Sequence, residues 1–195
     1  MKYQELAKLR ERLYFTVADL ADAFQVKPES ARVVCSRYVK NGLFIRLKNN
    51  FYVLDEKWVN FSREDFLKIS NFLQVPSYIS FMTALGLYGI TTQVPRNFFE
   101  SASLKRSKRL NIKGVAFNYY KLKKQFYFGF IKKDNIFIAT KEKAFIDSAY
   151  LYSFGKYKLD ISSLNLAKLD KGILNKTIKT FPKKTQLTLR KICKI

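Results

Sequence analysis

The sequence predicts an α+β fold in two domains. The first consists of three short helices and a two-stranded hairpin, and the second is a mixed α/β domain with a small, mainly antiparallel sheet. Apolar residues recur at helical spacing over the first 40 residues, and two short apolar runs follow. The charge then changes: residues 1–75 carry 13 basic and 9 acidic side chains, whereas residues 76–195 carry 24 and 6. This uneven charge favours two domains over one.

The net charge is the strongest indication of a partner. The 195 residues include 37 Lys and Arg against 15 Asp and Glu, a formal charge of +22. The excess positive charges repel one another in the folded state, and binding of a polyanion would relieve this repulsion. A nucleic-acid partner is one explanation, and a solvated lysine-rich surface is the other. A hydrophobic content of 48%, with 18 Phe and 12 Tyr, is sufficient for packed cores.

Several classes of chemistry are excluded or disfavoured by composition. The chain has no histidine, which removes histidine general bases, Ser-His-Asp triads and histidine-bound zinc. It has no glycine-rich phosphate-binding motif, and its two cysteines are far apart. The longest mostly apolar segment, residues 78–90, is too short to span a bilayer. We expect a soluble cytoplasmic protein with no catalytic residues, no cofactor, no metal and no membrane association.

The first two helices are predicted from apolar spacing and a capping pattern. Leu6, Leu9 and Leu13 share one face of a helix over residues 3–13. Thr16 then has the character of an N-cap, with Asp19 at the capping-box position three residues later. A second helix is therefore expected to follow Thr16.

Pro28 begins the third helix, because proline suits the first turn. The helix covers residues 29–41 and ends before Gly42, a typical C′ residue. Two strands are expected next, at residues 44–47 and 51–54, joined by a turn at residues 48–50. The predicted buried face of the helix comprises Ala31, Val34, Cys35, Tyr38 and Val39.

This order of elements resembles the winged helix-turn-helix. In that fold the third helix enters the major groove of duplex DNA and the wing contacts the backbone. Arginine can pair with guanine through two hydrogen bonds or hold a phosphate, while an ordinary solvated helix face is the alternative. The candidate DNA-binding residues are Lys27, Ser30, Arg32, Val33, Ser36, Arg37, Arg46 and Lys48.

The predicted domain limits are 1–58 for the DNA-binding domain, 59–75 for a connecting helix and 76–195 for a basic α+β domain. Ser62 is the expected N-cap of the connecting helix, and Pro76 follows its end. In the second domain we expect a buried helix over residues 77–87 and a helix beginning after Thr140. Strands are expected at 98–102, 115–121, 125–130 and 136–139, and short basic helices at 164–195. A dense basic run, a candidate antitoxic or phosphate-contacting patch, contains Lys105, Arg106, Lys108 and Arg109.

Five blocks in fixed order resemble the AbiEi-type antitoxins of abortive-infection loci. They follow the winged helix at residues 78–89 (YISFMTALGLYG), 91–95 (TTQVP), 128–130 (FGF), 138–139 (IA) and 142–147 (EKAFID). The resemblance implies a phage-resistance antitoxin that represses its own operon by binding operator DNA. It also implies an antidote to a nucleotidyltransferase-like toxin of the AbiEii type, acting without a stable complex.

Other interpretations of these residues remain open. A regulator without a toxin, whose second domain senses a ligand or forms an oligomer, is the main alternative, and a metal-dependent nucleic-acid enzyme is a third. Lys143 and Asp147, four residues apart, can pair on one helix turn. Gly129 indicates a bulge or a close backbone approach. The triplet Asp55-Glu56-Lys57 falls at the end of the expected wing and has no obvious partner acid. Its role, like that of Glu142, Lys143 and Asp147, is expected to be structural.

The aromatic-rich segment at residues 119–128 has two explanations. Interleaved tyrosine, phenylalanine and lysine side chains can stack the bases of a single strand. A strand pair with its aromatic face in the core is the alternative, and it is the one we favour. The residues concerned are Tyr119, Tyr120, Lys121, Lys123, Lys124, Phe126, Tyr127 and Phe128.

Overall fold

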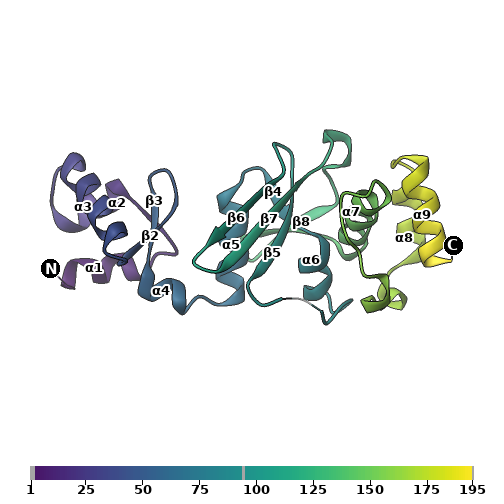
Figure 1. The fold of residues 1–195 in the computed structure, drawn as a ribbon, viewed down its shortest axis with the longest axis horizontal. Coiled ribbons are helices and arrows are strands. Elements are labelled where there is room, and N and C mark those ends of the chain that lie inside the picture. Colours follow the sequence, from purple (N-terminus) through teal and green to yellow (C-terminus); the bar gives the residue numbers. More distant parts are fainter. Residues whose placement is uncertain (1–2, 94, 195) are drawn as a thin grey trace. The chain divides into compact units, whose positions relative to one another are not determined.

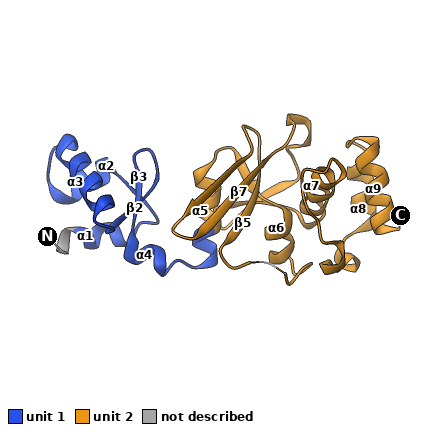
Figure 2. Cartoon of the chain, viewed as in Figure 1, with its two compact units in different colours: residues 1–66 blue, residues 67–195 orange. Residues whose placement is uncertain are grey.

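The computed structural model describes residues 3–93 and 95–194, and Figure 1 shows the course of the chain. Four residues of the segments discussed above lie outside these ranges: Met1, Lys2, Val94 and Ile195. The chain divides into two compact units, residues 1–66 and 67–195 (Figure 2). The division falls within helix α5 (Arg63–Leu73), the segment predicted to connect the domains.

Unit 1 contains the predicted helices and hairpin and two further elements. A short strand β1 pairs with β3, so the wing has three strands in the order β1-β3-β2, and a short helix α4 follows it. Neither was predicted, because each spans at most five residues and has no distinct periodicity. The elements are α1 (Tyr3–Arg10), β1 (Phe15–Thr16), α2 (Val17–Phe24), α3 (Pro28–Lys40), β2 (Phe44–Lys48), β3 (Phe51–Leu54) and α4 (Asp55–Val59).

The turn residues of unit 1 fix where its helices begin and end. The Thr16 side chain accepts a hydrogen bond from the backbone N–H of Asp19, whose carboxylate accepts from the Thr16 N–H in return, which confirms the capping box. Gln25 adopts a left-handed conformation, with φ of 52°, and ends α2. Gly42, with φ of 73°, ends α3 as predicted.

The core of unit 1 packs α2 and α3 against the wing. Phe15, Phe44 and Tyr38 meet edge to face, with ring centroids 4.9 and 5.0 Å apart in successive pairs. Cys35 is fully buried among them, as expected for a small apolar side chain. The predicted face of α3 is confirmed, because Ala31, Cys35 and Tyr38 are buried while Val34 and Val39 pack partly against the same core.

Unit 2 is built on a six-stranded mixed sheet of order β6-β7-β5-β4-β9-β8. Three pairings are antiparallel, and two, β5 with β7 and β4 with β9, are parallel. With the small sheet of unit 1, this confirms the predicted α+β class. The strands are β4 (Ser77–Ile79), β5 (Phe98–Ser103), β6 (Lys108–Ile112), β7 (Val115–Lys121), β8 (Phe130–Lys133) and β9 (Ile136–Ala139).

Two predictions in unit 2 were wrong, and one strand was missed. Residues 77–87 are not one helix, because β4 pairs with neighbours on both sides and only residues 81–87 form helix α6 (Phe81–Leu87). A segment that is buried on every side fits the pattern of a buried strand as well as that of a buried helix. The spacing of its apolar residues therefore could not distinguish the two. Residues 125–130 are not a strand, since a 3-10 turn (Lys124–Phe126) precedes β8. Edge strand β6 was missed because its charged residues obscure the alternation between apolar and polar side chains that indicates a strand.

Helix α7 (Lys141–Ser153) is the centre of unit 2. Thr140 caps it as predicted, and every residue from Glu142 to Leu151 is buried. The helix contacts α6, β9 and the two tail helices, α8 (Lys171–Ile178) and α9 (Lys183–Cys193), which confirm the predicted short helices (Figure 1). Within the residues described, no helix combines the length and apolar character needed to cross a membrane.

Candidate nucleic-acid interface

Helix α3 exposes the face that was predicted to meet DNA. Its first turn carries Pro28, and the residue before it, Lys27, is the N-cap. Val33 is 67% exposed, unusual for an apolar side chain on a helix that buries its opposite face. The other exposed candidates are Lys27, Ser30, Arg32, Ser36 and Arg37.

A hollow of about 700 Å³ lies between α3 and the wing. Arg32 and Ser36 of α3 and Arg46 of β2 line it, so the fold brings together three predicted residues from two elements. Arg46 donates a 3.0 Å hydrogen bond to the side chain of Asn49, which holds the guanidinium beside the wing turn. The hollow therefore presents two guanidinium groups and a hydroxyl on one surface.

Sequence reasoning missed several residues of this hollow. Lys40 follows Arg32 and Ser36 at spacings of eight and four, so helical periodicity could have placed it on their face. Asn50 gave no such signal: its left-handed conformation, with φ of 61°, lets its side chain accept a 3.2 Å hydrogen bond from the N–H of Val17. This contact joins the wing to the start of α2.

The remaining predicted residues lie outside the lining of that hollow: Lys27, Ser30, Val33, Arg37 and Lys48. The guanidinium of Arg37 lies 5.6 Å from the ring of Tyr38, and the ammonium of Lys48 lies 4.9 Å from the ring of Phe51. Arg37 is exposed and Lys48 is half-buried.

The basic run of unit 2 is spread over two kinds of structure. Lys105 and Arg106 lie in the connection after β5, whereas Lys108 and Arg109 lie on edge strand β6. Neighbouring residues of a strand point to opposite faces. The four cations therefore do not share one face, and Lys108 and Arg109 diverge.

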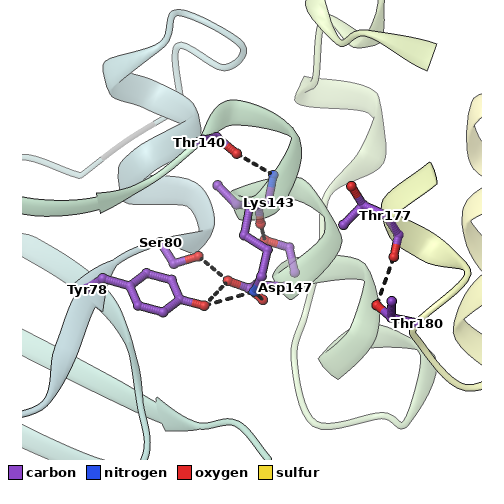
Figure 3. Close-up of polar contacts among 9 residues, drawn as sticks. Tyr78, Ser80, Thr140, Lys143, Asp147, Thr177 and Thr180 are labelled. Carbon is purple, nitrogen blue, oxygen red and sulfur yellow. Dashed lines mark hydrogen bonds and ion pairs between the residues drawn. The ribbon is translucent and has the colours of Figure 1, made fainter. Parts of the chain in front are cut away.

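Four residues from two of the family-like blocks meet in one buried network (Figure 3). The carboxylate of Asp147 accepts hydrogen bonds from the hydroxyls of Tyr78, at 2.9 Å, and Ser80, at 2.8 Å. The ammonium of Lys143 donates to the same carboxylate and, at 2.8 Å, to the Tyr78 hydroxyl. The predicted pairing of Lys143 with Asp147 is thus confirmed, and it occurs in the core rather than on a solvated helix face.

Burial controls the electrostatics of this network. It lowers the pKa of Lys143 and raises the pKa of Asp147, while the attraction between the two charges opposes both shifts. The ammonium also lies within 6 Å of the ring centroids of Tyr78, Phe128 and Phe181. Since all four polar residues are at most 2% exposed, the arrangement fits a structural centre and offers no atom to a ligand.

Gly129 is the close approach that was predicted. A Cβ atom there would lie 3.0 Å from Cγ of Lys143, and the φ of the residue is +71°. Its carbonyl accepts a 2.9 Å hydrogen bond from the N–H of Thr140. Gly129, in the block at residues 128–130, therefore packs against one side of the Lys143 side chain.

The aromatic-rich segment is largely core. Tyr119 and Phe126 are each 1% exposed, and Phe126 stacks on Phe181 with centroids 4.5 Å apart. Tyr120 is only partly buried, and it lines a cavity in unit 2. Packing of aromatic side chains in the core is thus confirmed for Tyr119 and Phe126, whereas the expected strand pair is wrong, because residues 124–126 form a 3-10 turn.

The acidic residues do not assemble a metal centre in the part of the chain described. No group of three or more His, Cys, Asp or Glu side chains is placed to hold an ion there. In the triplet at residues 55–57, Glu56 pairs with Arg10 at 2.6 Å, and Lys57 donates to the carbonyls of Arg10 and Arg12. Both side chains thus tie α4 to the segment around α1, in keeping with the structural role predicted for the triplet.

Comparison with known proteins identifies the fold and no more. No family model matches the sequence, and no curated protein matches it. The crystal structure of the Rv2827c protein from Mycobacterium tuberculosis is similar, with a TM-score of 0.61 over 97% of this chain and 76% of that chain. At 9% identity the likeness concerns the fold alone.

Proposed function

We propose that the chain is a sequence-specific DNA-binding protein that contacts double-stranded operator DNA through α3 and the wing. The observation that carries this proposal is the convergence of Arg32, Ser36 and Arg46 on one exposed hollow. An α-helix fits the major groove, where arginine and serine read base edges. The exposed Val33 offers an apolar contact for a thymine methyl group.

The proposal extends to an antitoxin that represses its own operon and counteracts a nucleotidyltransferase-like toxin of the AbiEii type. It rests on the ordered blocks at residues 78–147 that resemble the AbiEi-type antitoxins. The buried network supports it, because Tyr78 and Ser80 of one block contact Lys143 and Asp147 of another. Such a protein acts on DNA in the cytoplasm, provides resistance to phage and is not itself an enzyme.

Operator binding is tested with the full chain and two labelled duplexes. One covers the region upstream of the reading frame, and the other has the same composition in shuffled order. We expect the operator to bind at least about 10³-fold more tightly at physiological salt, the lower limit for a specific site. Equal affinities would contradict sequence-specific binding. The remaining affinity would then be the sequence-independent attraction of basic side chains to phosphates.

The antitoxin function is tested by co-expression. A nucleotidyltransferase-like protein encoded beside this chain should arrest growth when expressed alone, and this chain should restore growth. Co-purification of the two proteins should yield no stable complex. If the chain binds its operator but restores no growth, the regulator without a toxin becomes the better account.

A further inference from the structure

Unit 2 contains a cavity of about 580 Å³ that neither DNA binding nor the buried network explains. Its floor is built on the sheet, where Asn118 and Glu100 stand in register on the adjacent strands β7 and β5; Arg109, in register with Asn118 on edge strand β6, extends this row to the exposed rim. Residues in register across a sheet share a face. One row of polar side chains therefore crosses the base of the cavity.

Glu100 fixes the hydrogen-bonding character of this floor. Its carboxylate is 2% exposed and accepts hydrogen bonds from the hydroxyls of Tyr157, at 2.9 Å, and Tyr120, at 3.2 Å. It also accepts from the N–H of Met82 at 3.1 Å. Because each tyrosine donates its single hydroxyl proton to the carboxylate, its phenol oxygen can act towards a ligand only as an acceptor. The floor thus favours a ligand that brings N–H donors.

The local backbone is strained to complete this arrangement. Phe81 precedes Met82 and is fully buried with φ of +54°, a region that bulky residues rarely occupy. Its ring packs against Tyr120 and Tyr157, with centroids 4.8 and 5.3 Å away. Strain of this kind concentrates where a fold holds a functional group in place.

The rim of the cavity is cationic, and its walls are apolar. Arg109, Lys156 and Lys158 line the cavity and are exposed, while Phe98 and Met82 contribute apolar surface. A ligand that complements the floor, the walls and the rim of this cavity has a flat heterocycle with N–H donors on its edge and a multiply charged anionic group. A nucleotide has all three, and the volume lies within the range of ligand pockets.

We propose that this cavity binds a mononucleotide, with the base against Tyr120 and Tyr157 and the phosphates at Arg109, Lys156 and Lys158. The proposal is independent of operator binding, which involves unit 1. It gives unit 2 a ligand-sensing role that an antitoxin or a plain regulator can use equally.

The test is isothermal titration calorimetry of the full chain with ATP, GTP, CTP and UTP, and with adenosine and inorganic triphosphate. We expect at least one nucleotide to bind at least tenfold more tightly than adenosine or inorganic triphosphate. Equal binding of inorganic triphosphate would overturn the proposal in favour of a bare anion site. Binding of a ten-nucleotide single strand without any mononucleotide would overturn it as well, and so would no binding at all.

Two variants locate the site, with one control. Lys156→Gln/Lys158→Gln should weaken nucleotide binding at least tenfold, and both residues are exposed, so folding should be unaffected. Tyr157→Phe should weaken binding while keeping the ring. The control, Lys132→Gln/Lys133→Gln, removes two exposed charges from edge strand β8 and should bind like the wild type. Equal losses in the control and the rim variant would place the nucleotide elsewhere.

Discussion

The hydroxyl of Tyr78 on β4 and the carboxylate of Asp147 on α7 form a 2.9 Å hydrogen bond between residues 69 positions apart in sequence. This contact and the adjacent Lys143 connect the central sheet to the central helix of unit 2. Asp147 is fully buried and Lys143 is 2% exposed, so each charge depends on the other for compensation.

The first prediction concerns this buried pair. Asp147→Ala should lower the free energy of unfolding by about 3–5 kcal/mol, because it leaves the ammonium of Lys143 buried and unpaired. The double variant Lys143→Met/Asp147→Leu should cost less than the single change, since no charge stays uncompensated. Urea denaturation followed by circular dichroism measures both. As a control, Glu56→Ala breaks the exposed pair with Arg10 and should cost about 1 kcal/mol or less. A double variant as unstable as Asp147→Ala would contradict this account.

The second prediction separates close approach from backbone strain. Gly129→Ala and Gly114→Ala both place a side chain at positive φ, +71° and +81°, and should share a conformational cost of about 1 kcal/mol or more. Only Gly129→Ala also pushes against Lys143, since nothing lies within 4 Å of the Cβ position at Gly114. Gly129→Ala should therefore be clearly the less stable in urea. Equal losses in the free energy of unfolding would mean that the Lys143 side chain can move aside without an energetic cost.

The third prediction is a pH dependence of stability caused by Glu100. Burial raises the pKa of this carboxyl from 4.5 to about 7, although hydrogen bonds from Tyr157, Tyr120 and Met82 favour the charged form. Between these values the folded state holds a proton that the unfolded chain has released. The free energy of unfolding should therefore fall as pH rises from about 4.5 to about 7, by up to about 3 kcal/mol from this group.

Glu100→Gln isolates that contribution. The variant has no carboxyl to titrate, so its stability should decline less than that of the wild type over the same pH range. Urea midpoints measured every half unit of pH give the difference. Parallel curves for the two proteins would show that Glu100 titrates at the same pH in the folded and unfolded states.

The fourth prediction concerns sequence readout by α3. Arg32→Ala and Arg37→Ala should each weaken operator binding by about 1–3 kcal/mol and affect shuffled duplex much less. Fluorescence anisotropy on both duplexes measures this. Arg63→Ala removes the same charge from an exposed arginine of α5, outside α3 and the wing in sequence, and is the matched control. Equal losses on both duplexes would assign the arginines to phosphate contacts.

The fifth prediction concerns the basic run. Replacing Lys105, Arg106, Lys108 and Arg109 by Gln should flatten the slope of log K against log[salt] by about 0.9 for each cation that contacts a phosphate. Because Lys108 and Arg109 point to opposite faces of β6, we expect a change of about 1 to 3 rather than the full value. Lys132→Gln/Lys133→Gln on the opposite edge strand serves as the control. An unchanged slope would place the run away from DNA.

The sequence alone determined the elements whose signals are local. The capping box of Thr16 and Asp19, the proline start of α3 and the glycine after it depend on neighbouring residues, so unit 1 could be predicted almost completely. Helix α3 also has a clear polar face, and this is why the exposure of its candidate residues could be predicted. The charge excess of unit 2 was equally evident, because composition requires no geometry.

Only the tertiary structure decided what long-range contacts control. The segment at residues 77–79 is a strand because β5 and β9 pair with it, and the spacing of its apolar residues did not separate it from the helix that follows. The pairing of Lys143 with Asp147 was visible as helical spacing, but its burial depended on β4 and the tail helices closing around α7. Glu100 gave no sequence signal at all, because its role arises where three strands align and Tyr157, 57 residues away, reaches its carboxylate. Local spacing fixes the direction of a side chain on its own element, whereas burial and partners depend on elements that are distant in sequence.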